Sequence, residues 1–279
     1  MRARLLNEIL AAGEGSDPIL EIDDIHLSFA GVVAIDGVSI TVHNGELFAI
    51  IGPNGAGKTS IFNCISGLYQ PDRGSISFEG RDLLGMKPNR IADLGVARTF
   101  QNIELFPQMT VLDNLMLGRH QHVRYGSVAA VLRVGRAAAE EARNREVVEG
   151  IIEFLDIQAH RKSYVAMLPY GIQKRIELGR ALAMEPKLLL LDEPAAGMNL
   201  EETEDMARFI TDIKRELGIG IVLVDHDMRM VMDVADTVLA IDFGRPIAVG
   251  TPAEIQRNDD VIRAYLGQEH AVAEPGGDE

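Results

Sequence analysis

The sequence contains no tryptophan and a single cysteine, Cys64, and only 5% of its residues are aromatic. A surface that binds nucleic acid by stacking bases needs aromatic side chains, so this scarcity argues against one. One cysteine excludes a disulfide framework and a thiolate zinc site, and it fits a reducing cytoplasm. We expect Cys64 to be a small buried core residue. His120 and His122 lack the neighbours of a metal site and are expected to be solvated.

Long apolar runs and net positive charge are also missing. The densest apolar stretches, residues 47–51 and 188–191, are far shorter than the roughly 20 residues that span a bilayer. Basic residues precede an apolar stretch at the N-terminus, but Glu8 interrupts it and it is too short for a secretory signal. The formal net charge of −15 repels phosphate backbones and anionic membranes, so binding of a nucleotide requires a local site.

The composition that remains is that of a globular protein, with 47% hydrophobic and 25% charged residues in a chain of 279. Short runs of alternating polarity in residues 20–29 and 38–42 predict antiparallel strands with one solvated face. Residues 46–51, 187–191 and 219–224 are continuously apolar after their first residues, Glu46 and Lys187 in two of them, as in parallel strands covered on both faces. The sequence therefore predicts an α/β fold with a mixed sheet and an antiparallel β subdomain.

The middle of the chain lacks strand signals. Residues 110–113 (Thr-Val-Leu-Asp) offer a capping box, and residues 127–156 are rich in Ala, Glu, Arg and Val. We therefore expect an inserted helical subdomain that interrupts the α/β core. The predicted boundaries are a loose leader at 1–18, a core at 19–105 and 184–250, a helical subdomain at 106–183, and a C-terminal helical extension and tail at 251–279.

Residues 52–59 (Gly-Pro-Asn-Gly-Ala-Gly-Lys-Thr) fit the phosphate-binding pattern G-x-x-x-x-G-K-[ST], between a buried strand and a helical segment. Glycines let backbone N–H groups surround phosphates, and the helix N-terminus adds the positive end of a dipole. Lys58 would reach the β- and γ-phosphates, and the Thr59 hydroxyl would ligate Mg²⁺. The predicted nucleotide-binding residues are Gly52, Pro53, Asn54, Gly55, Ala56, Gly57, Lys58, Thr59 and Ser60.

Two adjacent carboxylates follow another buried strand, as the second motif of such a hydrolase requires. Residues 188–191 are all leucine, and Asp192, Glu193 and Pro194 come directly after them. Asp192 is predicted to hold the magnesium shell, and Glu193 to orient or deprotonate the attacking water. An apolar run before two acids is often only a strand end, but its combination with the phosphate-binding loop favours hydrolysis.

The order of these motifs resembles that of the ABC transporter ATPase family, from about residue 20 to residue 267. Residues 97–101 (Ala-Arg-Thr-Phe-Gln) look like the family's Q-loop. Residues 168–175 (Leu-Pro-Tyr-Gly-Ile-Gln-Lys-Arg) stand where its signature lies, and residues 196–199 (Ala-Gly-Met-Asn) match its D-loop. This resemblance implies the P-loop NTPase fold of ABC type.

The resemblance also assigns roles to single side chains. Gln101 would contact Mg²⁺ and the attacking water, His226 would be the switch histidine, and Phe29 would stack on adenine. Glu193, His226, Gln101 and Lys58 are thus the predicted catalytic residues. Taken singly, Gln101 could be an ordinary loop glutamine, His226 a strand-end residue and Phe29 a core residue.

The signature departs from the common Leu-Ser-Gly-Gly-Gln form. Only Leu168 and Gly171 are retained, whereas Pro169, Tyr170 and Ile172 replace the serine, the first glycine and the glutamine. In the family this loop binds the γ-phosphate of ATP held by the opposite subunit, so we expect Leu168, Pro169, Tyr170 and Gly171 to do so. Pro169 lacks a hydroxyl and a backbone donor, which weakens this contact. The D-loop departs as well, with Asn199 in place of aspartate.

These departures resemble the ATP-binding subunits of branched-chain, or hydrophobic, amino acid importers. Residues 62–69, 98–106, 193–199 and 262–267 carry this likeness. It implies an ATP hydrolase with ATP and Mg²⁺ as cofactors, peripheral at the cytoplasmic face of the inner membrane. Its partners would be transmembrane permease subunits, a second nucleotide-binding subunit, identical or paralogous, and, indirectly, a periplasmic or extracellular solute-binding protein.

Three kinds of function are alternatives to amino acid import: another transport system, a soluble ABC ATPase, and an inactive module. The chain could power import of urea or amides or export of lipids, or act as a soluble ABC ATPase on DNA, ribosomes or iron–sulfur assembly. Strong acidity disfavours DNA, and a single phosphate-binding loop disfavours the tandem translation factors. An inactive module with only a structural role is disfavoured because Lys58, Asp192, Glu193 and His226 are all present.

Overall fold

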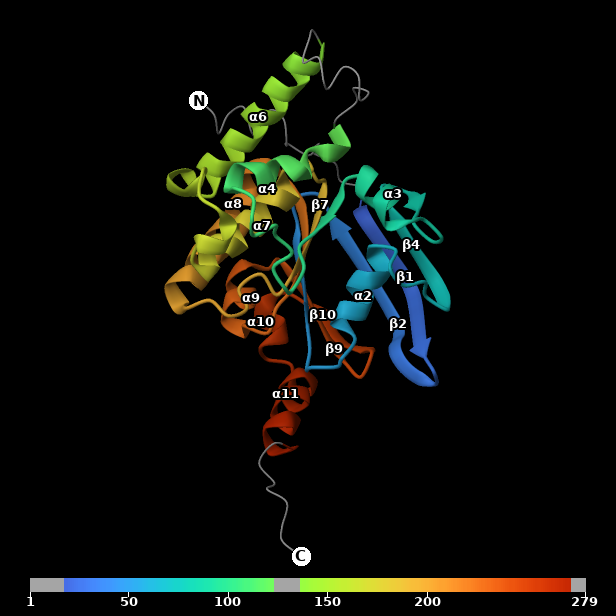
Figure 1. Cartoon of the computed structure of the whole chain (residues 1–279). Coiled ribbons are helices and arrows are strands. Elements are labelled where there is room, and N and C mark those ends of the chain that lie inside the picture. The colour runs from blue at the N-terminus through green and yellow to red at the C-terminus, as the bar shows by residue number, and fades with distance from the viewer. Residues whose placement is uncertain (1–17, 123–135, 272–279) are drawn as a thin grey trace, which may run out of the picture.

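The computed structural model describes residues 18–122 and 136–271, and its strands form two sheets (Figure 1). A four-stranded antiparallel sheet has the order β2-β1-β4-β5, and a six-stranded sheet has the order β10-β9-β3-β8-β7-β6. In the larger sheet only β10 runs antiparallel to its neighbour. The strands are β1 (Pro18–Phe29), β2 (Val32–His43), β3 (Leu47–Ile51), β4 (Arg73–Phe78), β5 (Arg81–Asp82), β6 (Val96–Arg98), β7 (Leu188–Asp192), β8 (Gly220–Val224), β9 (Thr237–Asp242) and β10 (Arg245–Gly250).

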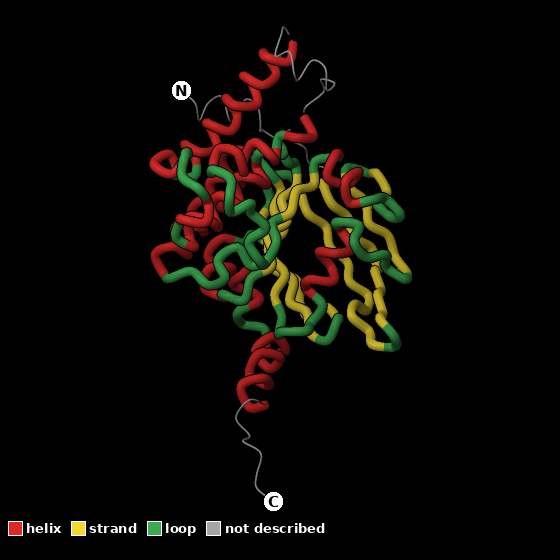
Figure 2. The backbone as a smooth tube through the Cα atoms, viewed as in Figure 1, coloured by secondary structure: helices red, strands yellow, loops and turns green. Residues whose placement is uncertain are grey.

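Most helices lie on one face of the larger sheet, and α2, labelled in Figure 1, lies between the two sheets (Figures 1 and 2). The described residues between β6 and β7 are helical or irregular, apart from an isolated bridge between Thr110 and Tyr164. The α-helices are α2 (Lys58–Ile65), α3 (Pro88–Asp93), α4 (Val111–Gly118), α6 (Arg136–Phe154), α7 (Tyr170–Leu182), α8 (Leu200–Leu217), α9 (Met228–Val234), α10 (Pro252–Ile255) and α11 (Asp259–Ala271), and the 3₁₀ turns are η1 (His120–His122), η2 (Gln158–His160) and η3 (Val165–Met167).

Side chains of the central strands alternate between two hydrophobic cores, as the pleat of a sheet requires. Leu188 and Leu190 of β7 face the core shared with α2 and the antiparallel sheet. Leu189 and Leu191 face the core shared with the helices on the other side. The continuously apolar strands predicted from the sequence are therefore confirmed as strands buried on both faces.

Several local expectations are refined by the structure. The two alternating runs in residues 20–29 belong to one strand, β1, whose pairing with β2 shifts between Ile22 and Ile25. Thr110 caps α4 as predicted, since its hydroxyl accepts from the Asp113 N–H at 3.2 Å. Of the helical stretch expected at 127–156, residues up to 135 lie outside the described part of the chain, as do residues 1–17 of the leader and 272–279 of the tail.

One surface expectation is wrong. His122 is half-buried, and its Nε2 lies 3.0 Å from the carbonyl oxygen of Met184. Its Nδ1 lies 3.8 Å from the Glu185 carboxylate. The fold brings the end of the segment after α4 against the turn after α7, a long-range contact that spacing along the sequence does not reveal. His120 is exposed, and no helix in the described ranges is long and apolar enough to cross a membrane.

Candidate nucleotide-hydrolysis site

The loop from β3 to α2 is shaped by glycines that no other residue can replace without a shift of the backbone. A Cβ at Gly52 would lie 2.3 Å from the carbonyl oxygen of Ile241, and one at Gly57 would lie 2.4 Å from that of Ala34. Gly57 also has a φ of 104°, a left-handed conformation that favours glycine, at the N-cap of α2. No side chain caps this helix, so its first N–H groups point from the loop toward the place of an anion.

Lys58 is held inside this loop by main-chain oxygens. Its Nζ donates to the carbonyl oxygens of Gly52 at 2.5 Å and Pro53 at 2.9 Å. Burial lowers the pKa of the Lys58 ammonium, while the charges of Glu193 and Asp192 act in the opposite direction. The two strand-end carboxylates therefore lie within electrostatic reach of the lysine. Asn54, Gly55 and Thr59 are exposed along the rim, as a loop that receives a ligand requires.

Asp192 ends β7 in a buried ion pair that the sequence analysis missed. Arg98 Nη2 lies 2.8 Å from Asp192 Oδ2, and Arg98 Nη1 donates to Asn63 Oδ1 at 2.7 Å and Ser66 Oγ at 3.1 Å. The guanidinium thus joins β6, α2 and β7. An arginine inside an otherwise buried strand was the available signal, because such a charge is rarely buried unless it is paired.

Glu193, Gln101 and His226 meet beyond the ends of β7 and β8. Gln101 Nε2 donates to Glu193 Oε2 at 2.8 Å, and His226 Nδ1 lies 3.8 Å from the same oxygen. Glu193 has a φ of 48°, and its backbone N–H donates to the carbonyl oxygen of Val224 at 2.7 Å. Because the parallel strands end together, three of the four predicted catalytic side chains lie close to one another. The fourth, Lys58, interacts electrostatically with the Glu193 carboxylate.

Asp225 binds the backbone next to this group and was also not predicted from the sequence. It is buried, its Oδ1 accepts from the Asp227 N–H at 2.9 Å, and its Oδ2 accepts from the Ala195 N–H at 3.4 Å. Burial raises the pKa of the Asp225 carboxyl, partly offset by the Asp227 N–H and by His226. These bonds fix the backbone on both sides of the Glu193–Gln101–His226 group.

Two residues of the loop at 168–171 lie against the segment that leads into α8 of the same chain, Tyr170 at Gly197 and Gly171 at Glu202. Pro169 is the N-cap of α7, and a Cβ at Gly171 would lie 2.3 Å from Glu202 Oε1. The Tyr170 ring approaches within 3.3 Å of a Cβ built on Gly197. Asn199 caps α8 in a reciprocal pair of bonds with Glu202, so its side chain does the capping work of an aspartate.

Helix α7 is tied to the segment that carries Gln101 by two buried charges. Lys174 Nζ donates to the carbonyl oxygen of Gln101 at 2.9 Å, and Glu177 Oε1 accepts from the Phe100 N–H at 3.4 Å. Burial raises the pKa of the Glu177 carboxyl, although Lys174 beside it acts to lower it. Neither residue was singled out from the sequence.

Phe29 ends β1 and is 43% exposed, so it is not a core residue. Tyr69 and Phe29 form a T-shaped pair, with ring centroids 5.0 Å apart and an interplanar angle of 68°. Such an edge contact leaves a ring face available for another planar group.

The predicted magnesium ligands are oxygen donors of the kind that Mg²⁺ prefers. They are the Thr59 hydroxyl, the Asp192 carboxylate and the Gln101 side-chain amide. Mg²⁺ commonly keeps several waters and binds through one or two protein groups plus phosphate oxygens, so a dense protein cluster is not required. Among the described residues there is no group of three or more His, Cys, Asp and Glu side chains that would hold a metal without a nucleotide. The donor set therefore fits a magnesium ion delivered with phosphate.

Comparison with known proteins agrees with this geometry. Residues 35–196 match the family model described as ABC transporter, and residues 245–271 match that described as branched-chain amino acid ATP-binding cassette transporter. The chain is 38% identical to the high-affinity branched-chain amino acid transport ATP-binding protein BraF of Pseudomonas aeruginosa, over 91% of this chain and 99% of that protein. It is 39% identical to the branched-chain amino acid transport protein LivG of Salmonella typhimurium, with the same coverage. It is 33% identical to the lipopolysaccharide export ATP-binding protein LptB of Haemophilus influenzae, over 90% of this chain and 98% of that protein.

Solved structures show the same fold. An ATP-binding cassette of an ABC transporter in its ADP conformation aligns with a TM-score of 0.79 at 29% identity, over 90% of this chain and all of that one. A nucleotide-free ATP-binding cassette aligns with a TM-score of 0.77 at 29% identity, over 89% of this chain and 98% of that one. The predicted mixed sheet with an antiparallel β subdomain is confirmed by both.

Proposed function

Because the chain belongs to the family of ABC transporter ATP-binding subunits, we propose that it binds Mg²⁺-ATP on residues 52–60 and hydrolyses it with Glu193 as the base. The observation that carries this proposal is the single edge of the larger sheet, where the phosphate-binding loop follows β3 and the Glu193–Gln101–His226 group follows β7 and β8. The carboxyl ends of parallel strands place a nucleotide and its attacking water side by side.

In this mechanism the loop of residues 52–60 surrounds the phosphates with N–H groups. Lys58 exchanges its bonds to the Gly52 and Pro53 carbonyl oxygens for bonds to the β- and γ-phosphates. Magnesium, when bound, neutralises charge on the phosphate oxygens and would be held by Thr59, Asp192 and Gln101.

Glu193 accepts a proton from, or orients, the water that attacks the γ-phosphate. Gln101, which donates to Glu193 at 2.8 Å, fixes the direction of that carboxylate. His226, 3.8 Å from the same oxygen, approaches the γ-phosphate from the side of β8. On the adenine side, the exposed face of Phe29 stacks on the base.

We further propose that two such subunits, identical or paralogous, face each other across two ATP molecules. Residues 168–171 of one subunit would cover the γ-phosphate held by the other. This proposal is supported by the helix N-terminus at Tyr170, where backbone N–H groups favour an anion even though Pro169 supplies no donor. Hydrolysis would remove the bridging γ-phosphate and separate the subunits.

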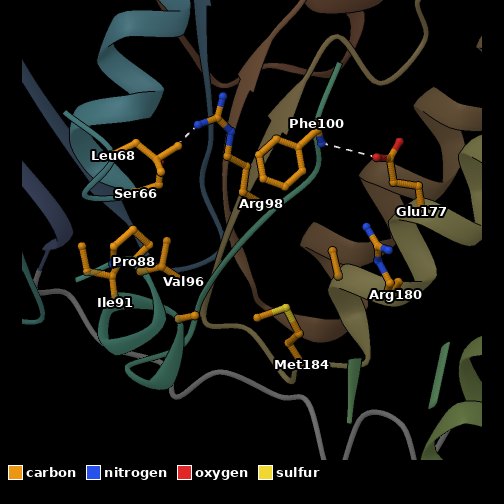
Figure 3. A pocket seen from close by; sticks show the side chains of 12 residues that line it. Ser66, Leu68, Pro88, Ile91, Val96, Arg98, Phe100, Glu177, Arg180 and Met184 are labelled. Atoms are coloured by element: carbon orange, nitrogen blue, oxygen red, sulfur yellow. Dashed lines mark hydrogen bonds between the residues drawn. The ribbon is translucent and has the colours of Figure 1, made fainter. Parts of the chain in front are cut away.

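The permease subunits would dock on a pocket of about 260 Å³ beside the Gln101 segment. Figure 3 shows apolar side chains from the region of α3 on one side and polar side chains of α7 on the other, with Phe100 between them. Arg98 reaches Asp192 from its wall, and Glu177 holds the Phe100 N–H. A permease segment in this pocket would therefore push on Arg98, which pairs with Asp192, and on Phe100, the residue before Gln101.

The system that this subunit powers is proposed to import branched-chain or other hydrophobic amino acids, from the cytoplasmic face of the inner membrane. The match of residues 245–271 to the branched-chain family model favours import over lipid export, despite the 33% identity to LptB. A solute-binding protein outside the membrane would deliver the amino acid to the permease. Urea or amide import is the second candidate within the same architecture.

Reconstitution tests the proposal. The chain, co-purified with its permease subunits and placed in liposomes with ATP inside, should drive uptake of labelled leucine when the solute-binding protein is added. The Lys58→Ala variant should assemble but support no uptake. Uptake of urea or amides instead would change the substrate, and failure to co-purify with permease subunits would refute the transport role.

A further inference from the structure

The turn between β9 and β10 is bonded to the phosphate-binding loop on one side and to the antiparallel sheet on the other (Figure 1). The Gly244 N–H donates to the carbonyl oxygen of Ala56 at 2.9 Å, and the Gly244 carbonyl oxygen accepts from the Asp36 N–H at 2.8 Å. A Cβ at Gly57 would lie 3.6 Å from the Cα of Gly244. This turn therefore joins the two sheets beside the loop that is proposed to bind the phosphates.

A pair of charged side chains joins the sheets at the same place. Arg245, the first residue of β10, donates from Nε to Oδ2 of Asp36 on β2 at 2.7 Å. The other Asp36 oxygen lies 3.1 Å from His26 Nδ1 on β1, and His26 Nε2 lies 3.1 Å from Asp24 Oδ1. The hydrogen bond from Arg245 lowers the pKa of the Asp36 carboxyl, which keeps the pair ionised at neutral pH. Charge as well as backbone bonding thus holds β10 to the antiparallel sheet.

The two sheets carry different parts of the proposed nucleotide site. Phe29, which is proposed to stack on adenine, ends β1 and pairs with Val32 at the start of β2. The loop of residues 52–60 follows β3 of the larger sheet. A nucleotide that contacts both must bridge the two sheets, so its affinity depends on how they are placed relative to each other.

We propose that Arg245 is a positioning residue for ATP, whose pair with Asp36 fixes the antiparallel sheet, and with it Phe29, relative to the phosphate-binding loop. This inference rests on the proposed nucleotide site. Asp36 and Arg245 are 209 residues apart in the chain, so only folding brings them together. The Arg245 side chain is 74% exposed, and salt should therefore screen the pair and weaken its effect.

The test is the Kd for ATP of Arg245→Gln in the full chain, measured by titration calorimetry together with kcat and KM. This change removes the charge and leaves a polar side chain. We expect the Kd and the KM to rise roughly 2- to 5-fold at low ionic strength, with little change in kcat, and the difference from the wild type to disappear at about 1 M salt. The matched control is Arg263→Gln, which removes an arginine of the same 74% exposure from its pair with Asp260 on α11, and which should bind ATP as the wild type does.

A double-mutant cycle with Phe29→Ala separates positioning from a merely structural effect. If Arg245 acts by placing Phe29, then Arg245→Gln causes no further loss of affinity in the Phe29→Ala background. An equal loss of affinity in both backgrounds would overturn the inference, because the pair would then act independently of Phe29. Wild-type Kd and KM values for Arg245→Gln would overturn it as well.

Lys58→Ala distinguishes these outcomes from failure of the nucleotide site. If Lys58→Ala loses ATP binding and Phe29→Ala weakens it, but Arg245→Gln binds normally, only the role of Arg245 fails. If Lys58→Ala or Phe29→Ala binds ATP as the wild type does, the proposed nucleotide site is itself wrong, and the inference fails with it.

Discussion

Arg98 is the side chain on which the strand-end carboxylate Asp192 depends. Both groups are almost fully buried, with side chains 9% and 5% exposed, and they form one ion pair at 2.8 Å. Removing one partner of a buried pair leaves the other charge without compensation, which costs about 3–5 kcal/mol. We therefore expect Arg98→Ala to lower the free energy of unfolding by about that amount, measured by urea denaturation.

Arg90→Ala is the matched control for this prediction. Arg90 pairs with Asp93 at 3.4 Å on the surface, where its side chain is 73% exposed. Such exposed pairs contribute about 0–1 kcal/mol. Equal losses of stability in the two variants would contradict the view that the Arg98 pair is a buried structural contact.

Cys64 provides a prediction that depends on pH. Burial raises the pKa of its thiol to about 12, with a smaller effect of Asp72 in the same direction. The thiolate is the reactive form, so at pH 8 native Cys64 should be alkylated roughly a thousandfold more slowly than a free thiol with a pKa of about 8.5. Mass spectrometry after iodoacetamide treatment, with and without urea, measures this. Rapid labelling of the native protein would show that the thiol is not buried.

The raised pKa of Cys64 also makes the free energy of unfolding depend on pH. The pKa of Cys64 is higher in the folded state than in the unfolded state, so the thiol's contribution is fully present below about pH 8.5 and is lost as pH rises toward 12. Cys64→Ser lacks this titration. The difference in unfolding free energy between the two proteins should therefore shrink as pH rises through this window.

At the residue scale the sequence predicted side chains that belong to motifs and missed those that support them. Lys58, Glu193 and Gln101 were predicted because their neighbours in sequence form recognisable patterns. Arg98 and Asp225 were missed because their partners are distant or are backbone groups brought near only by folding. His122 was misjudged for the same reason.

At the scale of elements, helix α8 depends on its cap. Asn199 accepts from the Glu202 N–H at 3.0 Å, and Glu202 Oε2 accepts from the Asn199 N–H at 3.1 Å. Asn199→Ala should lower stability by about 1 kcal/mol, within the usual range of about 0.5–2 for N-caps. Asn199→Asp should be nearly neutral, since aspartate caps as well as asparagine. Thermal unfolding of both variants checks this; equal destabilisation by Ala and Asp would show that capping is not the function of Asn199.

Elements with a strong local pattern were predictable, whereas their spatial arrangement was not. Residues 46–51, 187–191 and 219–224 were predicted as buried strands because continuous apolar runs have few other uses, and β3, β7 and β8 confirm them. The order of those strands, with β8 between β3 and β7, comes from packing across the whole sheet. Spacing along the chain does not contain that information.

At the scale of the whole molecule, we expect hydrolysis to depend on the pairing of two subunits. Within one chain, Tyr170 lies against Gly197 and Gly171 against Glu202, and the phosphate-binding loop lies at the end of β3. Two copies, or one copy and a paralogue, would complete each site by covering one nucleotide from both sides. ATP hydrolysis by the purified chain should therefore rise more steeply than protein concentration, unless a paralogous partner is required. Strict proportionality at all concentrations would indicate a site complete in one chain.

Glu193→Gln tests the central claim most directly, with MgATP hydrolysis and subunit association measured on the same preparation. The substituted amide can still accept the Gln101 N–H bond but cannot take up the proton. We expect the rate of hydrolysis to fall by roughly 10²- to 10⁴-fold, while ATP binding persists and MgATP shifts the variant to a dimer in analytical ultracentrifugation. Near-normal hydrolysis in this variant would contradict the assignment of Glu193 as the base, and with it the mechanism proposed for this subunit.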